Sequence, residues 1–296
     1  MSDPSDESFE VGSAPSPQPS PRKWREGVRA ALVEATQRLA PITDTPRLDA
    51  ELLMAHALGI ARSDLLLRHL DDPAPETFES LLQRRLTHEP VAYITGTRAF
   101  WTIELQVGPG ALIPRPDSET LIEAAIEHFD ERAPATILDL GTGPGTLLLA
   151  ALDQWPEARG LGVDASEQAL DYARANAGRL GMANRAEFRI GDWGQGVEGA
   201  FDLILANPPY IGTHESLPVE VRDHEPASAL FAGLDGLDDY RRIVPDLPRL
   251  LAPGGAAVLE IGWTQAKAVS ALALQHGLLP AVHSDLGGRP RVILLT

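Results

Sequence analysis

The stretch Ile137-Leu-Asp-Leu-Gly-Thr-Gly-Pro-Gly145 decides the fold, because an apolar segment runs directly into three alternate glycines. The residues that follow, 146–152, are mostly apolar and predict a helix. Glycines permit positive φ angles and close approach of a ligand, and the N-terminus of a helix offers free N–H groups to an anion. A strand, this turn and a helix therefore indicate the ligand-binding turn of an open α/β sheet. For the glycines alone, a tight turn before an ordinary helix is the alternative.

The spacing of the glycines distinguishes between cofactors. A dinucleotide-binding turn has the pattern G-x-G-x-x-G, whereas Thr146 occupies the third glycine position here. The run headed by Asp139 resembles instead the first motif of S-adenosylmethionine-dependent methyltransferases. Asp164 ends the next predicted strand, 19 residues after Gly145, where a carboxylate can accept both hydroxyls of a ribose. The cofactor-binding residues predicted from this pattern are Asp139, Gly141, Thr142, Gly143, Pro144, Gly145 and Asp164.

Alternating strand and helix patterns continue to the end of the chain. We predict an α/β fold, namely a Rossmann-like class I S-adenosylmethionine methyltransferase domain with a mostly parallel seven-stranded sheet, over residues 117–296. Strands are predicted at 136–140, 160–163, 187–190, 201–206 and 256–261, with two more at the C-terminal end. Helices are predicted at 118–129, 146–152, 166–180, 236–251 and 265–275.

The part of the chain before this domain has three different compositions. Residues 1–22 are acidic and rich in proline and serine, which predicts a disordered tail. Residues 23–90 predict a small N-terminal helical bundle that docks the substrate, and residues 91–116 predict a hairpin linker. The bundle's helices are expected at 24–39, 47–58, 63–70 and 76–87. Leu48, Leu52 and Leu58 are expected to face inward, and Ser63 to cap the third helix.

Composition excludes several classes of protein. The chain has 42 acidic and 25 basic residues, hence a formal charge of −17, which disfavours a protein that mainly grips nucleic-acid phosphates. It has no cysteine, which excludes disulfides, thiolate metal sites and cysteine nucleophiles. Six of the eight histidines lack ligand spacing, so no metal site is predicted. The other two, His214 and His224, follow Tyr210 in a loop, where they are expected to be solvated, with a place at the rim of the substrate entrance as the alternative. Without a long apolar run or a signal-peptide pattern, we expect a cytoplasmic protein that does not enter a membrane.

The sequence Asn207-Pro-Pro-Tyr210 follows the predicted strand 201–206 and suits a planar –NH2 acceptor. The Asn207 side-chain oxygen and the Pro208 carbonyl can each accept one N–H from such a group. Pro208 and Pro209 restrict φ and so preorganise these acceptors, and Tyr210 can stack on the planar group. These four residues are therefore the predicted catalytic and substrate-binding residues. A proline-rich exit from a strand with a surface tyrosine is the alternative.

Five segments occur in an order that resembles a known family. They are Pro90-Val-Ala-Tyr-Ile-Thr-Gly-Thr-Arg-Ala-Phe-Trp101, Leu112-Ile-Pro-Arg-Pro-Asp-Ser-Glu119, Asp139-Leu-Gly-Thr-Gly143, Asn207-Pro-Pro-Tyr-Ile211 and His224-Glu-Pro-Ala-Ser-Ala-Leu-Phe231. Together they resemble the HemK/PrmC family of peptide chain release factor glutamine methyltransferases, over residues 24–296. The resemblance implies N5-methylation of the glutamine in the Gly-Gly-Gln motif of class I release factors.

The same resemblance implies roles for individual residues. Gly141 to Gly145, Asp164, Trp193 and Asn207 would contact S-adenosylmethionine, and Asn207 to Tyr210 would hold the glutamine. The Trp193 indole can pack on an adenine ring, with closure of the sheet edge as the alternative. Arg115 and Glu119 would support the cofactor side, or else form a helix cap and a salt bridge.

Three other functions are weighed against this interpretation. A ribosomal-protein glutamine methyltransferase would use the same chemistry. A DNA or RNA adenine-N6 methyltransferase shares Asn-Pro-Pro-Tyr, but the chain lacks a stripe of basic residues. A non-enzymatic S-adenosylmethionine-binding module is the third. We therefore expect a monomer that binds a class I release factor as its protein substrate and contacts no nucleic acid directly.

Overall fold

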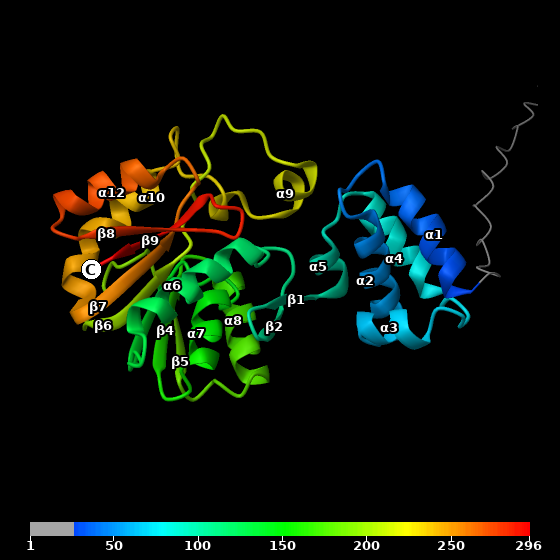
Figure 1. Cartoon of the computed structure of the whole chain (residues 1–296), viewed down its shortest axis with the longest axis horizontal. Coiled ribbons are helices and arrows are strands. Elements are labelled where there is room, and N and C mark those ends of the chain that lie inside the picture. The colour runs from blue at the N-terminus through cyan, green and yellow to red at the C-terminus, as the bar shows by residue number, and fades with distance from the viewer. Residues whose placement is uncertain (1–26) are drawn as a thin grey trace, which may run out of the picture.

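A helical bundle and a larger α/β domain follow one another in the computed structural model, which describes residues 27–296 (Figure 1). The predicted tail at 1–22 and Trp24 lie outside the described residues. The helices of the bundle are α1 (Val28–Leu39), α2 (Pro46–Leu58), α3 (Arg62–Arg68), α4 (Thr77–Leu86) and α5 (Val91–Thr95). Within residues 27–296 no helix is long and apolar enough to span a membrane.

The buried face of α2 differs from the predicted one. Leu48 is exposed and Leu52 is only partly buried, so the predicted inward direction is wrong for these two, whereas Leu58 packs against the core of the bundle as predicted. The face that packs inward instead carries Leu53 and Met54 together with two charged side chains, Asp49 and Glu51. Asp49 pairs with Arg85, and Glu51 with Arg47 and Arg62. Paired acids on the inner face therefore hid its periodicity in the sequence.

Two further local predictions in this part of the chain need correction. Ser63 lies inside α3, which begins at Arg62 after Ala61 and has no side-chain cap, so the predicted Ser63 cap is wrong. Residues 91–95, placed in a hairpin linker, form the short helix α5, which ends at Gly96 with a φ of +76°. Five residues are too few to show a helical period in the sequence.

The strands β1 (Thr97–Phe100) and β2 (Ile103–Gln106) form an antiparallel hairpin between the two domains. Figure 1 shows that this hairpin continues from α5 towards the helices of the α/β domain. Phe100, Ile103 and Leu105 are buried in the core that one face of the large sheet shares with α6 (Glu119–Phe129) and α7 (Thr146–Gln154). The hairpin is therefore anchored in the α/β domain by apolar packing.

The large sheet has the strand order β5-β4-β3-β6-β7-β9-β8, which confirms the predicted mostly parallel seven-stranded sheet. Pairing is parallel from β5 to β7 and antiparallel for β7-β9 and β9-β8. The strands are β3 (Thr136–Leu140), β4 (Arg159–Asp164), β5 (Ala186–Ile190), β6 (Phe201–Ala206), β7 (Leu251–Glu260), β8 (Pro280–Ser284) and β9 (Pro290–Leu295).

Helices cover both faces of this sheet, and the alternation of side chains along β6 shows why. Leu203 and Leu205 pack into the core on the side of α6, α7 and α8 (Glu167–Arg179), while Ile204 and Ala206 pack into the core on the opposite side. The second core is shared with α10 (Asp238–Ile243), α11 (Leu247–Leu250) and α12 (Ala266–Gln275). Both faces of the sheet are thus withdrawn from water, as parallel pairing requires.

One long helix was predicted where the structure has two short ones. The segment 236–251 forms α10, the 3₁₀ turn η3 (Val244–Asp246) and α11, and β7 already begins at Leu251. Pro245 and Pro248 lie in this segment, and each removes a backbone donor and crowds the preceding turn. The predicted continuous helix is therefore wrong.

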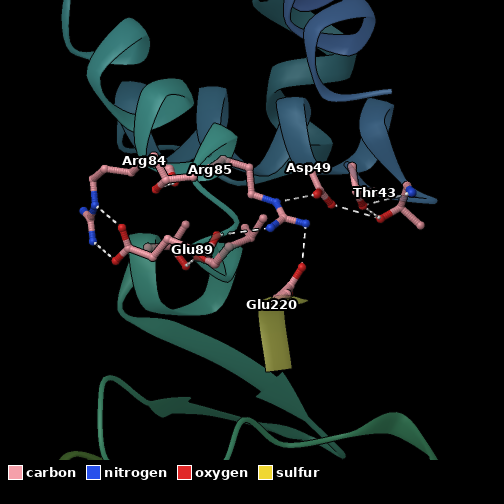
Figure 2. A network of polar contacts seen from close by, with 10 residues as sticks. Thr43, Asp49, Arg84, Arg85, Glu89 and Glu220 are labelled. Atoms are coloured by element: carbon pink, nitrogen blue, oxygen red, sulfur yellow. Dashed lines mark hydrogen bonds and ion pairs between the residues drawn. The ribbon is translucent and has the colours of Figure 1, made fainter. Parts of the chain in front are cut away.

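A polar cluster joins the helical bundle to the α/β domain (Figure 2). Arg85 on α4 is 2% exposed and donates to Asp49 of α2 at 2.8 Å and to the Glu89 carbonyl at 3.2 Å. The same guanidinium lies 2.7 Å from Glu220, which is carried by α9 (Val219–His224) in the long loop after β6. The loop therefore contacts the bundle directly through a charged pair.

We predict that removing the Arg85 side chain lowers the free energy of unfolding more than removing the Glu220 side chain. Arg85→Ala should lower the free energy of unfolding by about 3–5 kcal/mol, because it leaves the buried Asp49 carboxylate without its charged partner. Glu220→Ala should cost about 1 kcal/mol or less, since the Glu220 side chain is 33% exposed. Urea unfolding of the two full-length variants measures the difference, and equal costs would contradict this assignment.

Candidate functional site

A cavity of about 520 Å³ lies at the carboxyl edge of the parallel strands. Its size is within the range of small-molecule sites, roughly 300–1,000 Å³. The structure brings nine of the predicted site residues to its wall, namely Asp139, Gly141, Thr142, Gly143, Pro144, Asp164, Trp193, Asn207 and Pro209. Three further predicted residues, Gly145, Pro208 and Tyr210, belong to the same turns but are not among the lining residues.

The glycine-rich turn after β3 has three left-handed residues. Gly141, Gly143 and Gly145 have φ angles of +73°, +56° and +86°, which side chains other than glycine adopt only with strain. A Cβ atom on Gly145 would lie 2.9 Å from Leu149 Cδ1, so this glycine lets the first turn of α7 pack closely. A Cβ atom on Gly143 would meet nothing within 4 Å, because that residue faces open space. Gly143 is therefore the glycine whose backbone a ligand can approach.

Asp139 near the end of β3 is 1% exposed and has one carboxylate oxygen without a partner. Its Oδ2 accepts from the Thr142 hydroxyl at 2.6 Å and from the Leu148 N–H at 3.2 Å, while Oδ1 makes no hydrogen bond among the described residues. Burial raises the pKa of Asp139 to about 7. A buried acceptor of this kind, in the wall of a cavity, is suited to a ligand that brings a cation or an N–H donor.

Asp164 at the end of β4 connects two turns of the cavity wall. Its Oδ2 accepts from the Gly143 N–H at 2.7 Å, and its Oδ1 accepts from the Ser166 N–H at 2.8 Å. Burial raises the pKa of Asp164 as well. Each carboxylate oxygen has a second lone pair, so the carboxylate can also accept hydroxyl groups from a ligand.

Trp193 lies after β5 and packs over the glycine-rich turn. A Cβ atom on Gly141 would lie 2.8 Å from Trp193 Cζ3, so the indole occupies space that only a glycine leaves free. The indole N–H donates to Asp239 Oδ1 on α10 at 3.1 Å. Asp239 and Arg242 also line the cavity, and sequence reasoning missed both. Nothing distinguishes them locally from other charged residues on a helix surface.

Asn207 directly follows β6 and contacts Ser118, a buried residue of the same cavity wall, which in turn contacts Glu260; the sequence analysis missed both residues. The Asn207 side-chain N–H donates to Ser118 Oγ at 3.2 Å, and the Ser118 hydroxyl donates to Glu260 Oε2 at the end of β7. The Tyr210 hydroxyl donates to Glu260 Oε1 at 3.3 Å, and burial is the main cause that raises the Tyr210 pKa. Stacking of Tyr210 on a substrate therefore remains a prediction, because its hydroxyl is turned to Glu260.

Arg115 and Glu119 have different surroundings. Arg115 lines the cavity and pairs with the buried Glu225, which also accepts from the Ile113 N–H at 3.1 Å. Glu119 accepts from the Trp101 N–H at 2.9 Å and so ties the hairpin to the start of α6. Arg115 thus forms a salt bridge, as one interpretation predicted, and its support of the cofactor side stays a prediction. In the part of the chain that the structure describes, no cluster of His, Asp and Glu side chains could hold a metal ion.

The fold and the cavity together define a class I methyltransferase. Two family models match the chain: "PrmC N-terminal domain" over residues 30–96 and "Methyltransferase domain" over residues 132–276. Among solved structures, a methyltransferase from Pyrococcus furiosus is similar, with a TM-score of 0.50 and 18% identity over 73% of this chain and 98% of that chain. This likeness supports the fold.

Curated relatives give the family. A release factor glutamine methyltransferase of Caulobacter vibrioides is 42% identical over 85% of this chain and 89% of its own length. One of Cereibacter sphaeroides is 44% identical, over 89% of this chain and 96% of its own length. The chain therefore belongs to the release factor glutamine methyltransferase family.

The surroundings of Asp139 predict a specific pH dependence of stability. In the folded chain the Asp139 carboxyl group stays protonated up to pH about 7, whereas in the unfolded chain it loses its proton near about 3.9. Protonation of Asp139 therefore stabilises the folded chain at low pH, and this stabilisation is lost as pH rises through 7. Relative to the ligand-free wild type, the Tm of Asp139→Asn should therefore rise by roughly 2–4 °C or more between pH 5 and pH 8.

Thermal unfolding of ligand-free protein at the two pH values measures this difference. Asp171→Asn, on the exposed face of α8, is the matched control and should show no such rise. A Tm difference for Asp139→Asn that is the same at both pH values would contradict the assignment.

Proposed function

We propose that the protein transfers a methyl group from S-adenosylmethionine to the side-chain amide nitrogen of the glutamine in the Gly-Gly-Gln motif of class I peptide chain release factors. The observation that carries this proposal is the position of Asn207, whose carboxamide lies in the wall of the cavity that also contains Asp139 and Asp164. Membership of the release factor glutamine methyltransferase family supports the choice of substrate.

The residues of the cavity fit S-adenosylmethionine. The unpartnered Oδ1 of Asp139 suits a cationic group of this cofactor, and Asp164 has lone pairs left for ribose hydroxyls. Trp193, fixed by Gly141 and Asp239, offers a flat apolar surface for the adenine. The remaining glycine-turn residues, Thr142, Pro144 and Gly145, shape the backbone of this wall. When bound, the cofactor supplies an electrophilic methyl group on a positively charged sulfur.

The Asn207-Pro-Pro-Tyr210 turn is proposed to bind the acceptor. A glutamine –NH2 is weakly nucleophilic because its lone pair is delocalised, so its nitrogen must be held in line with the methyl group. Asn207 Oδ1 and the Pro208 carbonyl each accept one of its hydrogens, and Pro208 and Pro209 keep these acceptors in place. Transfer of the methyl group to this nitrogen would break the S–C bond of the cofactor, and the nitrogen would release one proton to solvent. Positioning of this kind can supply about 7–11 kcal/mol of the barrier.

The proposed partner is a class I release factor, docked on the helical bundle as a protein substrate. The bundle contacts the loop that carries α9 through Arg85 and Glu220, and the same loop lines the cavity with Pro226 and Ser228. A chain with a formal charge of −17 repels nucleic-acid phosphates, so we propose that it binds no nucleic acid directly. We further propose that it acts as a monomer in the cytoplasm, where translation terminates.

A labelling experiment tests the substrate. With radiolabelled S-adenosylmethionine and a class I release factor, we expect one labelled glutamine, identified by mass spectrometry in the Gly-Gly-Gln motif. A release factor with that glutamine changed to alanine is the control and should stay unlabelled. Persistent labelling of the control, or labelling of a ribosomal protein in its place, would contradict the proposed substrate.

A substitution tests the role of Asn207. Asn207→Ala should lower kcat by about 10²–10³-fold, the usual effect of removing one preorganised hydrogen-bonding group from an active site. Calorimetry should show that the variant still binds S-adenosylmethionine, since Asp139 and Asp164 are unchanged. Asn184→Ala, which removes an exposed side chain between α8 and β5, is the matched control. Near-normal turnover of Asn207→Ala would rule out this role.

A further inference from the structure

Ser118, which lines the cavity beside Asn207, forms a buried hydrogen-bonded pair with Glu260, and the proposed chemistry gives this pair no role. Ser118 is 2% exposed and Glu260 is 1% exposed, and 142 residues separate them along the chain. Glu260 ends β7, next to β6 in the sheet, and Ser118 ends the 3₁₀ turn η1 (Pro116–Ser118) that leads into α6. Two distant segments thus meet at the one side chain proposed to bind the acceptor nitrogen.

The Ser118 hydroxyl is not used for its common local purpose. Ser118 occupies the N-cap position of α6, where a serine side chain usually accepts a backbone N–H of the first turn. Here it makes no such bond, and its Oγ contacts Glu260 and Asn207 instead. A buried hydroxyl diverted from a helix cap to two other side chains indicates a function beyond starting the helix.

The donors and acceptors in this chain of contacts have a fixed direction. A carboxylate only accepts, and the two oxygens of Glu260 receive the hydroxyls of Ser118 and Tyr210. A hydroxyl has a single hydrogen, so Ser118, having donated it to Glu260, can only accept from Asn207. The Asn207 –NH2 must therefore face Ser118, and its Oδ1 must face away from this pair.

Several neighbouring groups act on the charge of Glu260. Burial raises the Glu260 pKa and the charge of Asp117 adds to this effect, whereas the hydroxyl donors Ser118 and Tyr210 and the charge of Arg291 on β9 favour the carboxylate. The Tyr240 hydroxyl donates to the Glu260 carbonyl at 2.7 Å and so holds its backbone without touching the carboxylate. The Glu260 carboxylate thus fixes the Ser118 hydroxyl as a donor to it, and Ser118 in turn can only accept from the Asn207 –NH2.

We propose that Ser118 and Glu260 are positioning residues that orient the Asn207 carboxamide with its oxygen towards the acceptor, and that this orientation makes the site select an amide over a carboxylate. The inference rests on the proposed function. A glutamate side chain has the shape of glutamine but can only accept hydrogen bonds when ionised. An Asn207 oxygen directed at a glutamate carboxylate disfavours binding of glutamate, because both groups are acceptors. A rotated Asn207 carboxamide would instead donate its N–H to that carboxylate.

The test compares binding of two forms of one full-length release factor, with Gly-Gly-Gln or Gly-Gly-Glu in the motif, to the full-length protein with S-adenosylhomocysteine present. Ser118→Ala removes the acceptor for the Asn207 –NH2, so both rotations of the carboxamide become accessible. We expect the preference for Gln over Glu to fall by about 10-fold or more, because a site built for one hydrogen-bonding pattern owes its selectivity to that pattern. The kcat for the Gln form should fall by about 10-fold, with the Kd for S-adenosylmethionine unchanged.

Two further variants separate positioning from a general structural effect. Tyr240→Phe is the matched control, since it removes a buried hydroxyl bound to the backbone of Glu260 and should keep the Gln preference. In an Asn207→Ala background, Ser118→Ala should cause no further loss of preference, because the side chain that it orients is gone. If Ser118→Ala acted through a general structural effect, it would lower the preference for Gln over Glu both in the otherwise wild-type protein and in the Asn207→Ala variant.

The outcomes distinguish this inference from the function on which it rests. If wild-type protein labels the glutamine but Ser118→Ala retains the full Gln preference, or loses it equally in the Asn207→Ala background, the positioning role is overturned and the methyltransferase function stands. If wild-type protein labels no glutamine in the release factor, the proposed function itself fails, and the proposed selectivity fails with it.

Discussion

Parallel pairing of β3 with both β4 and β6 is the constraint on which the cavity depends. The pairing aligns Leu140 with Val163 on one side and with Ala206 on the other, so the next residues along all three strands emerge at one edge of the sheet. The order of the strands also changes direction at β3. The strands β4 and β5 lie on one side of β3, whereas β6 and β7 lie on its other side. Open α/β sheets bind their ligands at such a point, because the connections diverge and leave a crevice.

Three acids, of which Asp139 and Glu260 are buried and Asp164 is partly buried, lie at or next to this crevice, and their surroundings differ. Asp164 accepts two backbone N–H groups and holds two turns together, whereas Asp139 keeps one oxygen without a partner among the described residues. Glu260 is 1% exposed and receives two hydroxyls, from Ser118 and Tyr210. A buried carboxylate is costly unless it is compensated. Glu260 is therefore engaged by protein groups, Asp164 keeps lone pairs that can accept ligand hydroxyls, and Asp139 has one oxygen without a partner that a ligand can compensate.

The loop after β6 connects the Asn207-Pro-Pro-Tyr210 turn to the rest of the molecule. It begins with Asn207 and contacts the helical bundle through Glu220 and Arg85 (Figure 2). It also binds the segment before α6 through Glu225 and Arg115. The pairs are buried on at least one side, where charge–charge contacts are screened less than on the surface. A substrate docked on the bundle would thus lie against the same loop that forms one wall of the cavity.

The sequence by itself determined the class of fold, the glycine-rich turn, the acids at Asp139 and Asp164 and the asparagine at 207, because each depends on residues adjacent in the chain. Strand periodicity, glycine spacing and proline positions are local signals, and they also determined the family resemblance. Only the tertiary structure decided that Ser118 and Glu260 stand behind Asn207, that Asp239 holds Trp193, and that Asp49 and Glu51 face inward on α2. These contacts join segments far apart along the chain, and a charged residue whose partner comes from a distant segment looks, in the sequence, like one exposed to water.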